Sequence, residues 1–157
     1  MAECVMSDIV VERGLQDKIC VASSATSSEE IGNPIYPPAV RKLVEKRVPV
    51  VNHHARKLCA QDRNCYDYFV GMEERNLVAM RRILGNDAPI SRLLDFSSNP
   101  RDIADPWWTG NFDVTYDDIV EGCNALVEHI IATDLNKTKI SDLKQSRNNL
   151  TKATDQK

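Results

Sequence analysis

Apolar residues recur every three or four positions in four stretches of the chain, which is the spacing of amphipathic helices. The last stretch is the clearest, and Thr115 with Asp118 approximates a capping box at its start. The first stretch has no Ser, Thr, Asp or Asn before it to cap its free N–H groups. We predict helices over residues 2–13, 37–48, 73–84 and 116–130.

Three shorter apolar runs, at residues 18–22, 66–71 and 90–96, are typical of strands. Because strands alternate with helices, we expect an α/β fold, a three-layer sandwich in which helices flank a parallel sheet on both faces. We expect one domain over residues 1–132. From Thr133 onward the chain is polar and has no aromatic residue, so residues 133–157 are predicted to be a mobile tail.

Composition and charge narrow the functional classes. The 157 residues are 42% hydrophobic and 27% charged, which suits one globular domain with a real core. The net charge is -3 and no basic face dominates, so we exclude nucleic acid and anionic membranes as primary partners. No apolar run approaches the ~20 residues of a membrane span. We therefore predict a soluble, cytoplasmic protein.

The cysteines and histidines are the candidate metal ligands. Five cysteines lie scattered without a close Cys-x-x-Cys pair, and an odd number cannot all pair within the chain, so we expect reduced thiols. His53 and His54 are adjacent, but no carboxylate or cysteine stands at ligand spacing from them. We predict hydrogen-bonding histidines and expect neither a metal nor a cofactor.

The stretch Asp105-Pro106-Trp107-Trp108-Thr109-Gly110 is the strongest candidate for chemistry. Proline favours extended backbone in the residue before it, so Asp105 is expected at the tip of a loop. The two indoles can wall a slot and exclude water from the carboxyl group, which favours the protonated form that a general acid needs. The alternative is an ordinary Asp-Pro turn followed by two core aromatic residues.

A serine-rich loop, residues 23–30, directly follows the first predicted strand. Such loops are usually solvated linkers. A loop that leaves a buried strand nevertheless lies at the sheet edge where α/β proteins bind ligands.

Several motifs, in this order and spacing, resemble the low-molecular-weight protein tyrosine phosphatases over roughly residues 1–131. They are Met1-Ala2-Glu3, Ser23-Ser24-Ala25-Thr26, Glu30-Ile31-Gly32-Asn33-Pro34, His53-His54-Ala55-Arg56, Met72-Glu73-Glu74-Arg75-Asn76 and Asp105-Pro106-Trp107. The resemblance implies that Asp105 is the general acid that protonates the leaving tyrosyl oxygen. It implies that Trp107, Trp108 and Glu30 contact the substrate, a phosphotyrosine protein or a small aryl phosphate. Ser23, His53 and Asn76 match residues that support the phosphate-binding loop.

One part of the family pattern is missing. The family's catalytic loop, a cysteine followed six positions later by arginine, lies immediately before the Met-Ala-Glu segment. In this chain the residues six positions after the five cysteines are Val10, Thr26, Cys65, Gly71 and His129. The central strand that carries the loop is missing with it, so we predict that the chain as written is inactive.

Three interpretations remain open. The first is a phosphatase whose sequence is given from an internal methionine. The second is a catalytically dead binding or scaffold protein that keeps the aromatic cleft. The third, an arsenate reductase on the same fold, also needs the missing loop and further paired cysteines, for which the spacing gives no support.

Overall fold

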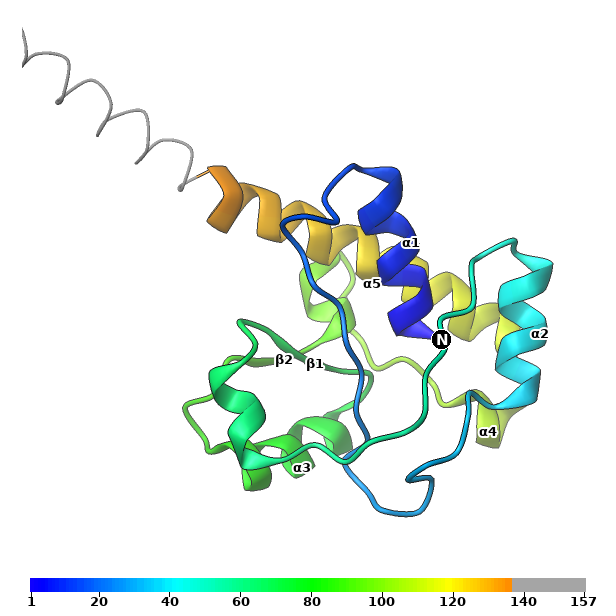
Figure 1. The fold of residues 1–157 in the computed structure, drawn as a ribbon, viewed down its shortest axis with the longest axis horizontal. Helices are drawn as coiled ribbons and strands as arrows, with labels where there is room; N and C mark the ends of the chain where they lie inside the picture. Colours follow the sequence, from blue (N-terminus) through cyan, green and yellow to red (C-terminus); the bar gives the residue numbers. More distant parts are fainter. Residues whose placement is uncertain (137–157) are drawn as a thin grey trace, which may run out of the picture.

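A parallel sheet lies between helices in the computed structural model of the protein, which describes residues 1–136 (Figure 1). Its strands β1 (Phe69–Gly71) and β2 (Ile90–Arg92) pair with Phe69 opposite Ile90. The helical elements are α1 (Ala2–Glu12), α2 (Pro37–Glu45), η1 (Ala60–Asn64), α3 (Glu74–Leu84), η2 (Leu93–Phe96), α4 (Pro106–Thr109), α5 (Phe112–Ile130) and the π-helical turn η3 (Ile131–Leu135).

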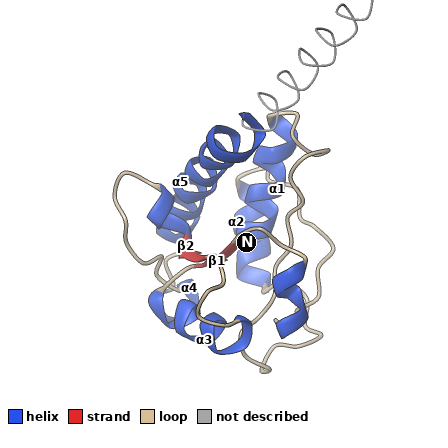
Figure 2. Cartoon of the chain, turned by 90° about the vertical axis from the view of Figure 1, so that its left-hand side faces the viewer, coloured by secondary structure: helices blue, strands red, loops and turns tan. Residues whose placement is uncertain are grey.

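Helices cover both faces of the sheet. Successive strand residues point to opposite faces, and Phe69 packs with Leu77 and Met80 of α3. Val70 packs on the other side, against the larger core cluster that α1 and α5 dominate. Figure 2 shows the strands between α5 and α3. The predicted α/β class with a parallel sheet and helices on both faces is therefore confirmed.

The large core cluster explains the pairing of α1 with α5. Its least exposed side chains come from both helices and from the segments beside them, and they include Cys4, Leu43, Leu94, Ile103 and Val127. Gly122 of α5 lies where an added Cβ would come within 2.5 Å of Leu93 Cγ. Its lack of a side chain lets α5 approach η2 closely.

The strands are shorter and fewer than predicted. Residues 18–22 were expected to form a strand, but this prediction is wrong, since no strand lies beside them within residues 1–136 to supply a hydrogen-bond ladder. The strand predicted at residues 66–71 forms only at Phe69–Gly71. The strand predicted at residues 90–96 forms only at Ile90–Arg92. Beyond it, Asp95 accepts a hydrogen bond from the Arg92 N–H (2.9 Å), and Leu93–Phe96 forms the helical turn η2.

The predicted capping box of the last helix is also wrong. α5 begins earlier, at Phe112, and its cap is Asn111, whose side chain accepts a hydrogen bond from the Val114 N–H (3.2 Å). Thr115 is buried, and its hydroxyl donates to the Ala104 carbonyl (2.9 Å). Asp118 pairs with Arg101 instead.

Both ends of the described chain are helical. α1 begins without a side-chain cap, as its sequence predicts. The start of the predicted tail is helical as far as the turn Ile131–Leu135, and residues 137–157 lie outside the described residues. Among residues 1–136, no helix combines the length and apolar character that a membrane crossing requires.

Candidate active site

Asp105 caps the short helix α4. Its backbone is extended (φ -71°, ψ 118°), as the following proline requires, and its Oδ1 accepts a hydrogen bond from the Trp107 N–H at 2.9 Å. Gly110 ends this helix in the left-handed conformation (φ 69°). One carboxylate oxygen is therefore held by the backbone, whereas Oδ2 is left free of the Trp107 N–H.

Two contacts join the Asp105 segment to the loop that follows β1. The Ile103 N–H donates to the Met72 carbonyl at 2.8 Å, and the Arg75 guanidinium lies 3.3 Å from Asp105 Oδ2. Ligand sites of parallel α/β sheets lie beyond the carboxyl ends of the strands. The carboxylate of Asp105 is thus docked where that rule expects a site.

Asn76 shapes this same loop. Its Oδ1 accepts hydrogen bonds from the N–H groups of Met72 (3.0 Å) and Glu73 (3.2 Å), so it completes the capping box of α3, whose N-cap is Glu73, and holds the turn out of β1. Gly71 permits the close approach, because a Cβ there would stand 2.9 Å from Asn76 Cβ. Asn76 therefore supports the loop that carries Arg75, and its role at a phosphate-binding loop stays a prediction.

The two tryptophans do not enclose Asp105. Trp107 is 59% exposed and Trp108 is 75% exposed, so the expected closed, dry slot is not formed. Trp107 instead packs on Tyr36, with ring centroids 4.8 Å apart, and Tyr36 lies 6.3 Å from the Phe112 ring. The result is an open aromatic platform, made of Tyr36, Trp107 and Phe112, beside the carboxylate.

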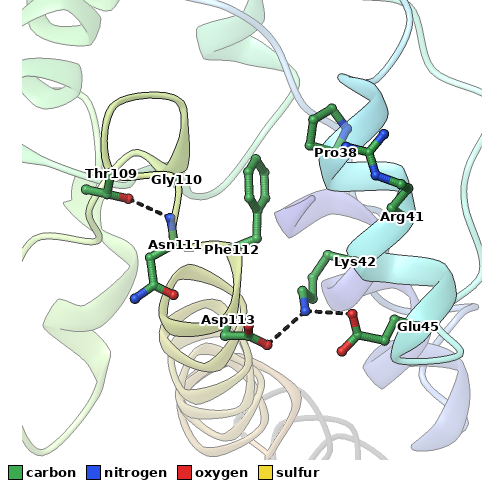
Figure 3. Close-up of a pocket in the computed structure, with 9 residues that line it drawn as sticks. All are labelled: Pro38, Arg41, Lys42, Glu45, Thr109, Gly110, Asn111, Phe112 and Asp113. Atoms are coloured by element: carbon green, nitrogen blue, oxygen red, sulfur yellow. Dashed lines mark hydrogen bonds and ion pairs between the residues drawn. The ribbon is translucent and has the colours of Figure 1, made fainter.

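A buried lysine links α2 and α5, the two helices that begin at this platform. Lys42 of α2 binds Asp113 of α5 (2.8 Å) and Glu45 (2.7 Å), and these carboxylates raise the pKa of the lysine (Figure 3). Tyr36 is the N-cap of α2, and Phe112 is the first residue of α5. The ion pair stands at an open polar pocket of about 630 Å³ between α2 and the turn that joins α4 to α5.

Ser23 and His53 meet at Glu3, in the first turn of α1. The Ser23 hydroxyl donates to Glu3 Oε2, and His53 Nδ1 lies 3.1 Å from the same oxygen. The three side chains join the start of α1, the serine-rich loop and the histidine pair. No group of three or more metal-ligating side chains is found in the described part of the chain.

The serine-rich loop is docked on the segment after His53. The Ala25 N–H donates to the Arg56 carbonyl (2.7 Å), and the Gly32 N–H donates to the Ala55 carbonyl (2.8 Å). Glu30 lies at the exposed turn of this loop, where its carboxylate accepts a hydrogen bond from Asn33 (2.8 Å). Glu30 is therefore not in contact with Asp105 or the platform in this structure.

None of the cysteines is placed as a nucleophile beside Asp105. All five thiols are free, as predicted. Cys4 and Cys123 are buried in the core, and burial raises the pKa of the Cys123 thiol to about 12. Cys59 lies at the start of η1, where its thiol contacts Asp62 (3.4 Å).

Comparison with known proteins identifies the family. The profile of low molecular weight phosphotyrosine protein phosphatases matches residues 1–139. The chain is 32% identical over 134 residues to the low molecular weight protein-tyrosine-phosphatase YfkJ of Bacillus subtilis, covering 83% of this chain and 86% of the relative. It is 30% identical over 133 residues to PtpA of Staphylococcus aureus, covering 83% and 84%.

A solved structure agrees with these sequence matches. The crystal structure of YfkJ from Bacillus subtilis superposes with a TM-score of 0.81 at 30% identity and covers 85% of this chain and 86% of that one. The fold, the order of the motifs and the profile match therefore agree that this chain belongs to the low molecular weight phosphotyrosine protein phosphatase family.

Proposed function

We propose that this protein serves the dephosphorylation of phosphotyrosine proteins or small aryl phosphates, with Asp105 as the general acid. The observation that supports the proposal is the position of Asp105, at the start of α4 near the carboxyl end of β1, with an exposed aromatic platform beside it. The free thiols further suggest that it acts in the reducing cytoplasm.

The proposed reaction has two steps. A thiolate attacks phosphorus, the bond from phosphorus to the aryl oxygen breaks, and Asp105 gives its proton to that oxygen. Water then attacks the cysteinyl phosphate, the sulfur–phosphorus bond breaks, and Asp105 takes the proton of the water. The same carboxyl group therefore acts first as acid and then as base.

The hydrogen bonds of Asp105 indicate which oxygen carries the proton. Oδ1 is occupied by the Trp107 N–H, so Oδ2 is the oxygen that would be protonated. The contact of Arg75 with Oδ2, at 3.3 Å, is longer than the ~2.7–2.9 Å of a strong charge-assisted hydrogen bond. We expect Arg75 to release Oδ2 when a phosphate ester binds.

The nucleophile is the missing part of this mechanism. A reactive thiolate needs a lowered pKa from a helix N-terminus or a cation, and no cysteine of the sequence is followed six positions later by arginine. We therefore propose that the 157 residues as written do not turn over, while the same residues preceded by an apolar strand and a Cys-x5-Arg loop do. We call this second protein the extended chain.

Incubation with a chromogenic aryl phosphate tests the inactivity of the 157-residue protein. We expect no hydrolysis above background, because the attacking group is absent. The extended chain serves as the positive control, and the extended chain with its loop cysteine replaced by serine serves as the negative control. Turnover by the 157-residue protein anywhere near the ~1 to 1000 per second of ordinary enzymes would refute the proposal.

A separate prediction concerns substrate choice. In the extended chain, Trp107→Ala and Trp108→Ala should each weaken aryl phosphates more than alkyl phosphates, because only an aryl ring can stack on these two exposed indoles. Ring contacts of ~0.5–1.5 kcal/mol correspond to a loss of roughly 2- to 13-fold in kcat/KM. Equal losses for both substrate types would show that the indoles do not bind the substrate ring.

A catalytically dead binding protein is the second candidate, and the missing Cys-x5-Arg pattern favours it. Such a protein would bind phosphotyrosine peptides through the aromatic platform without cleaving them. Saturable peptide binding by the 157-residue protein, lost in Trp107→Ala, would support that candidate. The phosphatase proposal instead expects weak binding until a phosphate-binding loop is added.

A further inference from the structure

The open polar pocket of about 630 Å³ beside Lys42 is continuous with the aromatic platform (Figure 3). One wall of the pocket is α2, and the other is the turn of residues 109–113, which begins two residues after Trp107. Phe112 belongs to both features, because its ring lies 6.3 Å from Tyr36 on the platform and also lines the pocket. A peptide whose aromatic residue lies on the platform can therefore continue across the mouth of this pocket.

The separation of the two rings indicates which peptide residue meets the pocket. An extended peptide advances ~3.3 Å per residue. The 6.3 Å between the Tyr36 and Phe112 rings thus corresponds to about two residues of extended chain. The side chain that faces the pocket belongs to a residue one or two positions from the aromatic one.

Four charged side chains line the pocket, and three of them are already paired with one another. Lys42 is buried and binds both Asp113 and Glu45. Arg41 is exposed, and its guanidinium forms no hydrogen bond or ion pair within residues 1–136. Arg41 is therefore the charged group of the pocket that can still take a partner.

An acidic side chain is the partner that suits Arg41. A guanidinium presents a planar fork of N–H donors that matches the two oxygens of a carboxylate. An incoming ammonium group would be repelled by Arg41, and it would compete with Lys42 for the carboxylates of Asp113 and Glu45. The pocket thus favours an acidic side chain over a basic one.

We propose that Arg41 is a specificity-determining residue, which selects phosphotyrosine substrates with Asp or Glu one or two positions from the phosphotyrosine. The acidic side chain lies in the pocket and pairs with the guanidinium while the substrate ring lies on the platform. This proposal rests on the proposed function and extends it to the sequence around the phosphotyrosine. Arg41 takes no part in the chemical steps, since it is carried by α2 and has no contact with Asp105.

Tryptophan fluorescence of the full 157-residue protein measures this preference, because its two tryptophans, Trp107 and Trp108, both lie at the site. The protein is titrated with tryptophan-free phosphotyrosine peptides that carry Glu, Gln or Lys at the two positions on each side of the phosphotyrosine. At low salt the Glu peptide should bind roughly 2- to 5-fold more tightly than the Gln peptide, as an exposed ion pair allows. Salt at about 0.5 M should reduce this difference. The Lys peptide should bind no more tightly than the Gln peptide.

A pair of variants assigns the preference to Arg41. Arg41→Gln should remove the difference between the Glu and Gln peptides. Arg82→Gln should keep it, because Arg82 is an exposed arginine of α3 that also has no ion pair within the described residues and does not line the pocket. Where binding to the 157-residue protein is too weak to measure, the same comparison of kcat/KM in the extended chain decides.

Three outcomes would overturn the proposal: no preference in the parent, a preference for the Lys peptide, or an equal preference for Glu in Arg41→Gln and the parent. Failure of the proposed function has a different signature. The extended chain would then not hydrolyse aryl phosphates, while the preference for the Glu peptide would still be seen in the fluorescence titration of the 157-residue protein.

Discussion

Asp105→Asn should lower the turnover of the extended chain by roughly 10²- to 10⁴-fold while substrate affinity changes little. Asparagine keeps the shape of the side chain and can still accept the Trp107 N–H, but it has no proton to give to the leaving oxygen. The measurement is steady-state hydrolysis of a phenyl phosphate at saturating substrate.

Asp102→Asn is the matched control for this substitution. Asp102 is a neighbouring exposed carboxylate that binds Arg92 (3.0 Å) and has no contact with the platform or with Arg75. Its loss should leave turnover close to that of the parent. Equal rates for Asp105→Asn and the parent would show that another group supplies the proton.

The extended chain should also be more stable than the 157-residue protein by on the order of 10 kcal/mol. A strand buried on both faces adds four or five apolar side chains, each worth ~1.5–3 kcal/mol. Whole domains keep only ~5–15 kcal/mol of net stability, so the 157-residue protein should be loosely packed or prone to aggregate. A pocket of about 780 Å³, lined by Val21 and Val70 among others, lies where we expect the added strand to pack.

Urea unfolding of the two proteins side by side measures this difference. An extension of equal length made of glycine and serine is the control, because it adds chain without apolar burial. We expect a cooperative transition only when the apolar strand is present. A sharp two-state transition of normal size for the 157-residue protein would mean that the strand is dispensable.

Local sequence rules predicted the conformation of Asp105 well. The constraint that a proline places on the preceding residue acts between neighbours, so it holds whatever the rest of the fold does. The roles of Asn76 and Gly71 at the start of α3 also depend on residues close to them in the chain, but local sequence rules predicted neither of them. Asn76 was named only through the resemblance to the family.

Strand formation at residues 18–22 could not be predicted in the same way. A strand is stabilised by hydrogen bonds to another strand, and the apolar pattern says nothing about whether that neighbour exists. Here the run is apolar as expected but borders a pocket, which separates it from β1.

Two contributors to the site were missed, for different reasons. Tyr36 contacts Trp107, which lies far from it in the sequence, and the spacing of apolar residues does not predict contacts between distant segments. Glu3 gave a usable signal, because it lies on the same face of α1 as Met6 and Val10, which are buried. An acidic residue on an apolar helix face indicates partners, which the structure identifies as Ser23 and His53.

The dependence of turnover on the leaving group tests the role of Asp105 most directly. The extended chain and its Asp105→Asn variant are compared on aryl phosphates whose phenols range from strongly to weakly acidic. If Asp105 protonates the leaving oxygen, the variant should lose little with the most acidic phenol and up to ~10⁴-fold with the least acidic one. A loss of the same size for every phenol would contradict the assignment of Asp105 as the general acid.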